Sequence, residues 1–204
     1  MIARPHDLLW LRNRAALAAI TESWVSQVWH PDLPVVVRRD HNESGLIPVG
    51  VRGEQREQRA AGWVDPADVV RVVTPESLAE RAQLLDSPFT AYAPVRAAIA
   101  LSDIAWPWRW GITGSTGYAL ATQRPTLHAA SDLDLVIRAP QPLTRDALQQ
   151  WQIQTDALDC RIDTQVETPC GAFALNEWLR EGRALLKTAT GPLLTASPWS
   201  RENP

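Results

Sequence analysis

The fold of this chain is decided by residues 110–138, WGITGSTGYALATQRPTLHAASDLDLVIR. In its first half the pair Gly114-Ser115 follows a short apolar segment and precedes residues 116–122, which can form a helix. Backbone N–H groups at a glycine turn before a helix point toward one place and suit an anion, and glycine has no Cβ to block a phosphate. This half therefore predicts a phosphate-binding turn, although a Gly-Ser pair alone is more often only a turn.

The second half contains two acids that alternate with aliphatic residues. Residues 131–137, SDLDLVI, predict a strand whose successive side chains face opposite ways. Asp132 and Asp134 then share one face about 6.6 Å apart along the chain, while Leu133 and Leu135 pack inward. Such carboxylates repel each other, and a divalent cation that bridges them and a bound phosphate relieves the repulsion. The alternative is a solvated edge strand, but such an edge more often carries lysine, threonine or mixed charge.

A third acid is predicted on a neighbouring strand. Residues 160–166, CRIDTQV, alternate so that Arg161, Asp163 and Gln165 share one face. If this strand lies next to residues 131–137, Asp163 joins Asp132 and Asp134. The alternative is a surface acid on a half-buried strand.

A Gly-Ser turn, an acid-aliphatic-acid strand and a later lone acid resemble the DNA polymerase β-like nucleotidyltransferase superfamily. The resemblance implies an α+β fold, with a nucleotidyltransferase-like mixed β-sheet and flanking helices, and in-line displacement at phosphorus. It further implies two Mg²⁺ ions held by Asp132, Asp134 and Asp163, with Asp163 as general base. Gly114 and Ser115 would hold the leaving phosphates. The gap of 16 residues between Ser115 and Asp132 is longer than is usual in that superfamily.

A closer resemblance, over nearly the whole chain, is to the phosphoribosyl-dephospho-CoA transferases of malonate decarboxylase, its holo-acyl-carrier-protein synthases. It is carried by residues 114–122, 127–129 and 131–135, and outside the core by residues 4–10, 48–53 and 167–178. The resemblance implies triphosphoribosyl-dephospho-CoA as the donor and a serine of the apo acyl carrier subunit of malonate decarboxylase as the acceptor. Pyrophosphate is the second product that it implies.

Residues 1–88 are predicted to form a smaller β-rich N-terminal domain for carrier-protein or substrate recognition, and residues 89–204 the catalytic domain. The boundary is placed at residues 86–88, Asp-Ser-Pro. Predicted elements of the first domain are a helix over 10–28, strands over 35–39, 46–52, 60–64 and 69–73, and a helix over 75–84. Those of the second are helices over 94–105, 144–158 and 173–183, a strand over 184–188, and a turn at 191–192.

Two further features each have two interpretations. Lys187, the only lysine, lies in an apolar strand, where a substrate phosphate or a carboxylate at the edge of the core would balance its charge equally well. We expect it to bind substrate. Trp106, Trp108 and Trp110 alternate, which suits stacking on an adenine but more often indicates an aromatic strand packed into the core.

The composition excludes several classes of protein. The net charge is −3 and no long basic run is present, which argues against a partner that is a nucleic-acid polymer. Arg52, Arg56 and Arg59 would instead meet an acidic carrier protein or belong to a solvated loop. The sequence contains no run of about 18 apolar residues, so no membrane span is predicted. An acid and a proline near the N-terminus do not suit a signal peptide, and a cytoplasmic protein is therefore expected. Cys160 and Cys170 are expected to be reduced, structurally neutral thiols.

Two other functions remain open from the sequence. A related nucleotidyltransferase would adenylylate a small molecule or a protein, and it would turn over ATP without any CoA derivative. A carrier-binding module without enzymatic activity would use the acids to hold calcium or a structural ion, and it would release no pyrophosphate.

Overall fold

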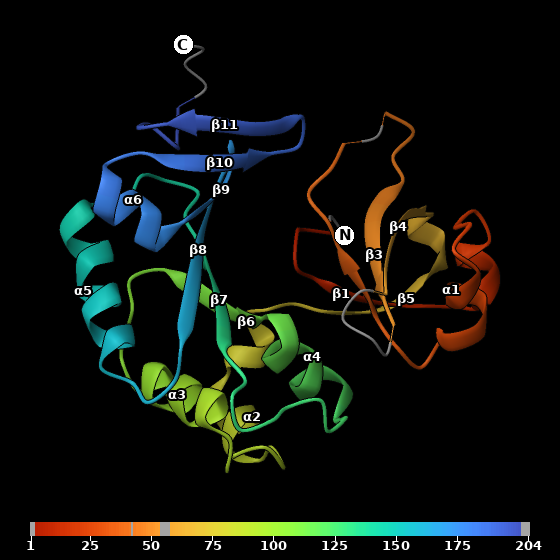
Figure 1. Ribbon diagram of the computed structural model, residues 1–204, viewed down its shortest axis with the longest axis horizontal. Helices are drawn as coiled ribbons and strands as arrows, with labels where there is room; N and C mark the ends of the chain where they lie inside the picture. The colour runs from red at the N-terminus through yellow and green to blue at the C-terminus, as the bar shows by residue number, and fades with distance from the viewer. Residues whose placement is uncertain (1–2, 42, 54–57, 201–204) are drawn as a thin grey trace. The chain divides into compact units, whose positions relative to one another are not determined.

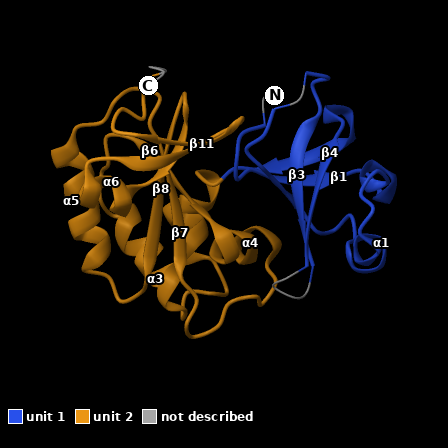
Figure 2. Ribbon diagram, turned by 45° about the horizontal axis from the view of Figure 1, so that its top comes forward, with its two compact units in different colours: residues 1–74 blue, residues 75–204 orange. Residues whose placement is uncertain are grey.

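The computed structural model describes residues 3–41, 43–53 and 58–200 and has an α+β fold, as predicted. The chain divides into two compact units, Met1–Thr74 and Pro75–Pro204, each with its own β-sheet (Figure 2). This division precedes the predicted boundary at residues 86–88 and assigns the segment from Pro75 onward to the second unit. Within the described residues, no helix is sufficiently long and apolar to cross a membrane.

The first unit is built on a five-stranded antiparallel sheet in the order β4-β3-β2-β1-β5. Its strands are β1 (Leu8–Leu11), β2 (Val35–Val37), β3 (Ile47–Arg52), β4 (Arg59–Val64) and β5 (Val69–Val73). Its helices are the 3-10 turns η1 (Arg14–Leu17) and η2 (Pro66–Asp68) and the short α1 (Ser23–Val28). Inward-facing strand residues such as Val35 and Val49 meet Leu17 and Trp29 in one buried core. The four strands predicted over residues 35–73 are confirmed.

The helix predicted over residues 10–28 is wrong in its first half. Trp10 and Leu11 lie in β1, whose four apolar residues are all buried and which pairs with both β2 and β5. Helical structure begins only after Asn13, whose side chain accepts a hydrogen bond from the Ala15 N–H at 3.0 Å. Burial in the middle of a sheet outweighs a loose helical period.

The second unit contains a six-stranded mixed sheet in the order β11-β10-β9-β8-β7-β6. Its strands are β6 (Arg109–Thr113), β7 (Leu133–Arg138), β8 (Ile162–Thr168), β9 (Gly171–Ala174), β10 (Ala184–Thr188) and β11 (Gly191–Thr195). Neighbouring strands are antiparallel except β7 and β8, which run parallel. A parallel pair brings the same ends of two strands together, and the predicted acids lie at this pair.

Helices flank this sheet, as predicted. They are η3 (Ser77–Ala79), α2 (Arg81–Leu85), α3 (Ala93–Ser102), α4 (Gly114–Thr122), α5 (Arg145–Asp156) and α6 (Leu175–Glu181). In Figure 1, α5 and α6 lie to the left of β8, and α4 lies to the right of β7. The side chain of Thr144 caps α5 by accepting a hydrogen bond from Ala147 N–H at 3.3 Å, which confirms the predicted start.

Two predicted helices of this unit differ from the observed elements. Residues 75–84 form η3 and then α2, because Glu80 between them has an extended backbone with φ −65° and ψ 122°. Phe173 does not begin a helix but lies in β9, fully buried and paired with Val166 of β8. Helix α6 starts two residues later, at Leu175.

The alternating tryptophans, each partly buried, pack around one fully buried tryptophan. The rings of Trp106, Trp108 and Trp110 surround Trp151 of α5 at centroid distances of 4.7, 6.2 and 5.6 Å. Trp151 is fully buried, and its Nε1–H donates to the hydroxyl of Thr164 in β8 at 3.0 Å. These contacts favour the core interpretation over stacking on an adenine, because they hold α5 against the sheet.

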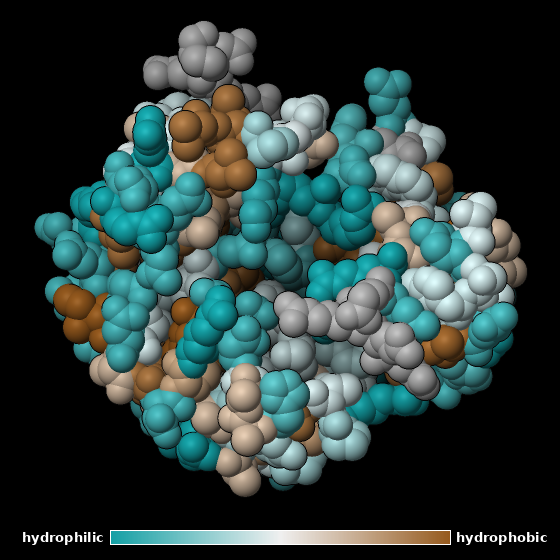
Figure 3. Space-filling view, in the orientation of Figure 1, coloured by the Kyte–Doolittle hydropathy of each residue, from teal (hydrophilic) through white to brown (hydrophobic). Residues whose placement is uncertain are grey.

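The outer hairpin of the sheet, β10 with β11, exposes apolar side chains. Leu185 pairs directly with Leu194, and both are exposed, as is Leu193. Hydrophobic side chains accordingly gather over β10 and β11 in Figure 3. The strand and turn predicted over residues 184–192 are confirmed: Ala184 and Leu186 of β10 are buried, and β11 after the turn is the edge strand.

Candidate active site

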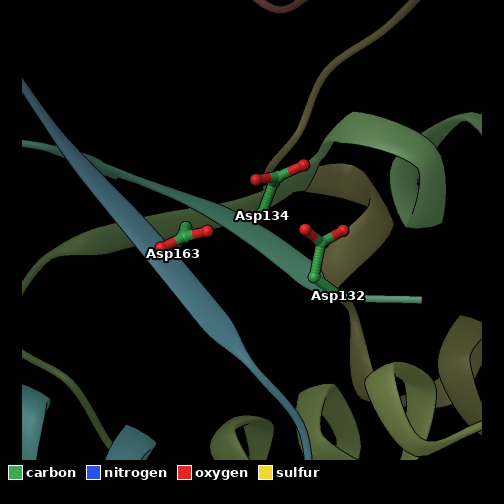
Figure 4. Close-up of side chains that lie close together, drawn as sticks. All are labelled: Asp132, Asp134 and Asp163. Atoms are coloured by element: carbon green, nitrogen blue, oxygen red, sulfur yellow. The ribbon is translucent and has the colours of Figure 1, made fainter. Parts of the chain in front are cut away.

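The parallel pair of β7 and β8 brings the three predicted acids together. Asp134 is the register partner of Asp163, and Asp132 directly precedes β7. Each of the three residues offers a carboxylate oxygen, and these oxygens lie within 4.8 Å of one another. Figure 4 shows Asp132 and Asp134 on one strand and Asp163 on the next. All three side chains are half-buried, which leaves their carboxylates accessible to a ligand.

A close backbone approach lies next to this cluster. Gly114, the first residue of α4, has a φ of +63°, and a Cβ placed on it would lie 1.9 Å from Oδ2 of Asp134. Both observations require glycine at this position. The N–H groups of Gly114 and Ser115 are at the start of α4, where backbone N–H groups have no partner within the helix. The predicted anion-binding turn thus adjoins the carboxylates.

Two threonines that sequence reasoning missed fix the backbone that carries the acids. The hydroxyl of the buried Thr116 donates to the carbonyl of Asp132 at 3.0 Å, and the hydroxyl of the half-buried Thr113 donates to the carbonyl of Asp134 at 3.3 Å. Both bonds join the segment around the Gly-Ser turn to the segment that carries the acids. A threonine near the start of a helix is typical of a cap, so the sequence gives no signal for this longer contact.

A cation lies in the cluster as well. Arg161 Nη2 donates to Oδ2 of Asp163 at 2.7 Å. The two side chains lie two residues apart and therefore on the same face of the sheet. The alternation of residues 160–166 already placed Arg161 on the face of Asp163. Its contact with the acid was not predicted.

Cys160 adjoins the same cluster. Burial, and next the negative charge of Asp132, raise the pKa of the Cys160 thiol above its usual range, while a backbone contact with Leu133 acts in the opposite direction. The thiol is therefore protonated at neutral pH. This agrees with the prediction of a reduced, structurally neutral thiol, and both cysteines of the chain are free.

Further along the same sheet face lies a buried ion triad. Arg138 of β7 contacts Glu76 at 3.0 Å and Glu167 of β8 at 2.6 Å, and all three side chains are largely buried. Gly111 of β6 packs directly on the backbone of Pro75 and Glu76. The segment at the start of the second unit is thereby fixed to the sheet beside the acids.

Lys187 is not part of the acid cluster. It is exposed on β10, opposite Ala172 of β9, which is in turn opposite Glu167. The apolar surroundings expected for Lys187 are therefore wrong, because its side chain is on the exposed face of β10, whereas Ala184 and Leu186 of the same strand are buried. Two strand spacings and a four-residue offset separate it from Asp163 by roughly 16 Å, on the same face of the sheet.

The donor set suits a hard divalent cation. Among the described residues, the cluster consists of three carboxylates and contains no thiolate or imidazole. Carboxylate oxygens are typical ligands of magnesium, calcium and manganese. A cation would also relieve the mutual repulsion of the acids, of which Arg161 offsets only one charge.

Comparisons with known proteins agree over both units. The phosphoribosyl-dephospho-CoA transferase MdcG N-terminal domain family matches residues 4–75, and the MdcG C-terminal domain family matches residues 77–198. A phosphoribosyl-dephospho-CoA transferase of Klebsiella pneumoniae (strain 342) is 66% identical over 199 residues, 98% of this chain and 97% of the relative. Those of Pseudomonas putida (strain W619) and Azotobacter vinelandii (strain DJ / ATCC BAA-1303) are 42% and 40% identical, over 97% and 98% of this chain and 95% of each relative. No solved structure matches the chain.

Proposed function

The chain belongs to the phosphoribosyl-dephospho-CoA transferase family, and from this membership we propose that it is the transferase that completes the acyl carrier subunit of malonate decarboxylase. The donor would be triphosphoribosyl-dephospho-CoA, and the acceptor a serine hydroxyl of the apo carrier. The observation that carries the proposal is the set of three carboxylates next to an anion-binding glycine turn. A polyphosphate needs both a counter-charge and N–H donors.

We further propose that the second unit is a nucleotidyltransferase of the DNA polymerase β-like type. The mixed sheet, the turn at the start of α4 and the acids on two adjacent strands support this assignment. The 16 residues between Ser115 and Asp132 form most of α4 and the segment that leads to β7, so the longer gap leaves the site geometry intact.

The residues of the chain define the proposed reaction. The serine oxygen forms a bond to the α-phosphorus, the bond from that phosphorus to the bridging oxygen breaks, and pyrophosphate leaves. Asp163 would accept the serine proton, because it is half-buried and belongs to the carboxylate cluster. Gly114 and Ser115 would bind oxygens of the leaving phosphates through their backbone N–H groups.

The three carboxylates would hold two Mg²⁺ ions, with Asp132 and Asp134 shared between them and Asp163 bound to one. Bound there, the cations would neutralise the charge on the attacking oxygen and on the leaving pyrophosphate. Thr113 and Thr116 would keep Asp134 and Asp132 at the required positions through their backbone contacts.

Lys187 remains a proposed contact for a distant part of the substrate. It lies on the face of the sheet that carries Asp163, but beyond hydrogen-bond distance of the cluster. A donor as long as phosphoribosyl-dephospho-CoA extends well beyond its reacting phosphates. The carrier subunit, by contrast, is proposed to contact the first unit, and the reaction is proposed to occur in the cytoplasm without a nucleic-acid partner.

Mass spectrometry of the apo carrier tests the proposal. After incubation with this protein, Mg²⁺ and triphosphoribosyl-dephospho-CoA, the carrier should gain the mass of phosphoribosyl-dephospho-CoA. Asp132→Ala or Asp134→Ala should abolish the gain without unfolding the protein. Asp156→Ala, which removes an exposed acid of α5, should leave the gain unchanged.

Other results would point elsewhere. A gain of an adenylyl group from ATP instead would retain the proposed fold and assign adenylyl transfer. Absence of any pyrophosphate release would favour a carrier-binding module, and near-normal transfer by the two variants would refute the role of the carboxylates.

A further inference from the structure

Arg161 lies on β8's N-terminal side, next to the three carboxylates of the cluster. The Leu133 N–H donates to the Arg161 carbonyl at 2.9 Å, and Leu133 is the register partner of Ile162. Arg161 therefore adjoins Asp132 in the way that Asp163 adjoins Asp134, and side chains two residues apart share a face. The four side chains form a patch of three acids and one guanidinium.

The contact of Arg161 with the cluster is easily exchanged. The side chains of Arg161 and Asp163 are 76% and 44% exposed, and such ion pairs in water are weak. Arg138 on the same sheet face is 8% exposed and fixed between two glutamates. A buried pair of that kind is costly to break, whereas Arg161 can leave its partner and stay hydrated.

We propose that Arg161 is a mobile counter-ion of the site, which neutralises Asp163 before a divalent cation binds and then binds a phosphate oxygen of the donor. This rests on the proposed function, because it assigns a contact to the same polyphosphate substrate. A guanidinium that leaves a carboxylate keeps its planar fork of donors, and this fork matches a phosphate as well as a carboxylate.

Arg161 and a divalent cation would compete for the same oxygen of Asp163, so the guanidinium leaves when the cation binds. Arg161 donates to Oδ2 of Asp163, so a cation that takes this oxygen displaces the guanidinium. The displaced side chain remains next to Asp132 and Asp134, where the phosphates of the donor must lie if the cluster binds them. Metal binding and phosphate binding thus become coupled through one side chain.

The test uses the full chain and measures two affinities without any turnover. Mn²⁺ binding is measured by electron paramagnetic resonance in the absence of phosphates, and inorganic pyrophosphate binding by calorimetry in the presence of Mg²⁺. Arg161→Ala should bind Mn²⁺ about two- to fivefold more tightly, as expected when one exposed ion pair no longer competes. It should bind pyrophosphate about tenfold or more weakly, because a hydrogen bond between two charged groups is lost.

Two matched variants separate this role from a general charge effect. Arg81→Ala removes another exposed arginine that pairs with an aspartate, Asp103, in the same unit, and it should change neither affinity. Arg161→Lys keeps the charge but lacks the fork, so its Mn²⁺ affinity should stay near that of the unchanged protein while its pyrophosphate affinity falls.

The outcomes distinguish this proposal from the proposed function. Arg161→Ala with unchanged Mn²⁺ affinity, or with unchanged pyrophosphate affinity, would overturn the role of Arg161. If Asp134→Ala still abolishes Mn²⁺ binding in that case, the proposed active site stands. Equal Mn²⁺ binding by Asp134→Ala and the unchanged protein would overturn both.

Discussion

Asp134 of the candidate site is in contact with three other parts of the second unit. It is the register partner of both Thr113 and Asp163, and its carbonyl accepts the Thr113 hydroxyl. Gly114 approaches its carboxylate so closely that no side chain fits between them. The position of this carboxylate is therefore determined from two neighbouring strands and the start of a helix.

Gly114→Ala tests this close approach. The new Cβ would overlap Asp134 Oδ2, so the carboxylate must move, and we expect transfer to fall by about two orders of magnitude. The positive φ adds a loss of stability of about 1 to 2 kcal/mol. Gly182→Ala is the matched control, because its φ is +70° and nothing lies within 4 Å of its Cβ. Both variants should lose stability in thermal unfolding through the positive φ, and equal transfer by the two would contradict the site geometry.

The Cys160 thiol reports on the charge of Asp132. In a Cys170→Ser background, Asp132→Asn should lower the Cys160 pKa, because the second-largest cause of its increase is removed and burial remains. The rate of alkylation by iodoacetamide should then reach half its maximum at a lower pH. Asp156→Asn should not move this midpoint.

The sign of the linked stability follows from the same shift. A thiol pKa that is higher in the folded than in the unfolded chain stabilises the fold below the unfolded pKa, and this stabilisation is lost as the pH rises through the folded pKa. Asp132→Asn should reduce this loss at alkaline pH. An alkylation midpoint that does not respond to Asp132→Asn would contradict the electrostatic contact.

Among single residues, the acids and the glycine were predictable and the supporting contacts were not. The period of two in residues 131–137 and 160–166 places Asp132, Asp134 and Asp163 on shared faces whatever the rest of the chain does. Arg161 and Thr116 follow the same local patterns as many surface residues. Their partners depend on which strands become neighbours, and local periodicity does not contain that information.

At the scale of elements, pairing in a sheet decided the segments that were predicted incorrectly. Trp10 and Phe173 lie at the ends of segments with helical composition, yet both are in strands. A short strand between two others gains buried area and hydrogen bonds on both sides, which outweighs a small difference in propensity. Helix α5 was predicted well because its threonine cap and apolar period are both local signals.

The tryptophan cluster makes α5 a structural support of β8. Trp151→Ala removes a fully buried ring in contact with three others, so we expect a loss of about 3 to 5 kcal/mol in the free energy of unfolding. Ile153→Ala on the same helix removes a side chain that is 51% exposed and should cost no more than about 0.5 kcal/mol. Chemical denaturation measures both. A small effect of Trp151→Ala would support a surface role for the tryptophans, such as stacking on a base.

At the scale of the whole molecule, the division into units coincides with the two family matches. The contacts of the chain divide it after Thr74, and the two family matches meet in the same region, at residues 75 and 77. The sequence placed the boundary at a polar turn with a proline, where a linker is typical. The observed division was not visible locally, because the segment from Pro75 belongs to the second unit through its contacts with Arg138 and Ile112.

The first unit carries the residues that we propose for carrier recognition. Arg52 of β3 and Arg59 of β4 are exposed and directly opposite each other. Arg56, the third arginine predicted for this contact, lies outside the described residues. Like charges at opposite positions destabilise a strand pair, so an acidic partner would compensate for a cost that the free protein bears.

Arg59→Glu separates stability from recognition. The new carboxylate would lie opposite Arg52 and stabilise the hairpin by about 0.2 to 1 kcal/mol, so the melting temperature should stay the same or rise. If the arginines meet an acidic carrier, the KM for the apo carrier should nevertheless rise about tenfold at low salt, and the increase should shrink as salt screens the charges. The KM for the donor should not change. Arg183→Glu reverses the charge of an exposed arginine in the second unit and is the control for net charge. If Arg59→Glu leaves the KM for the carrier unchanged at low salt, carrier recognition lies elsewhere.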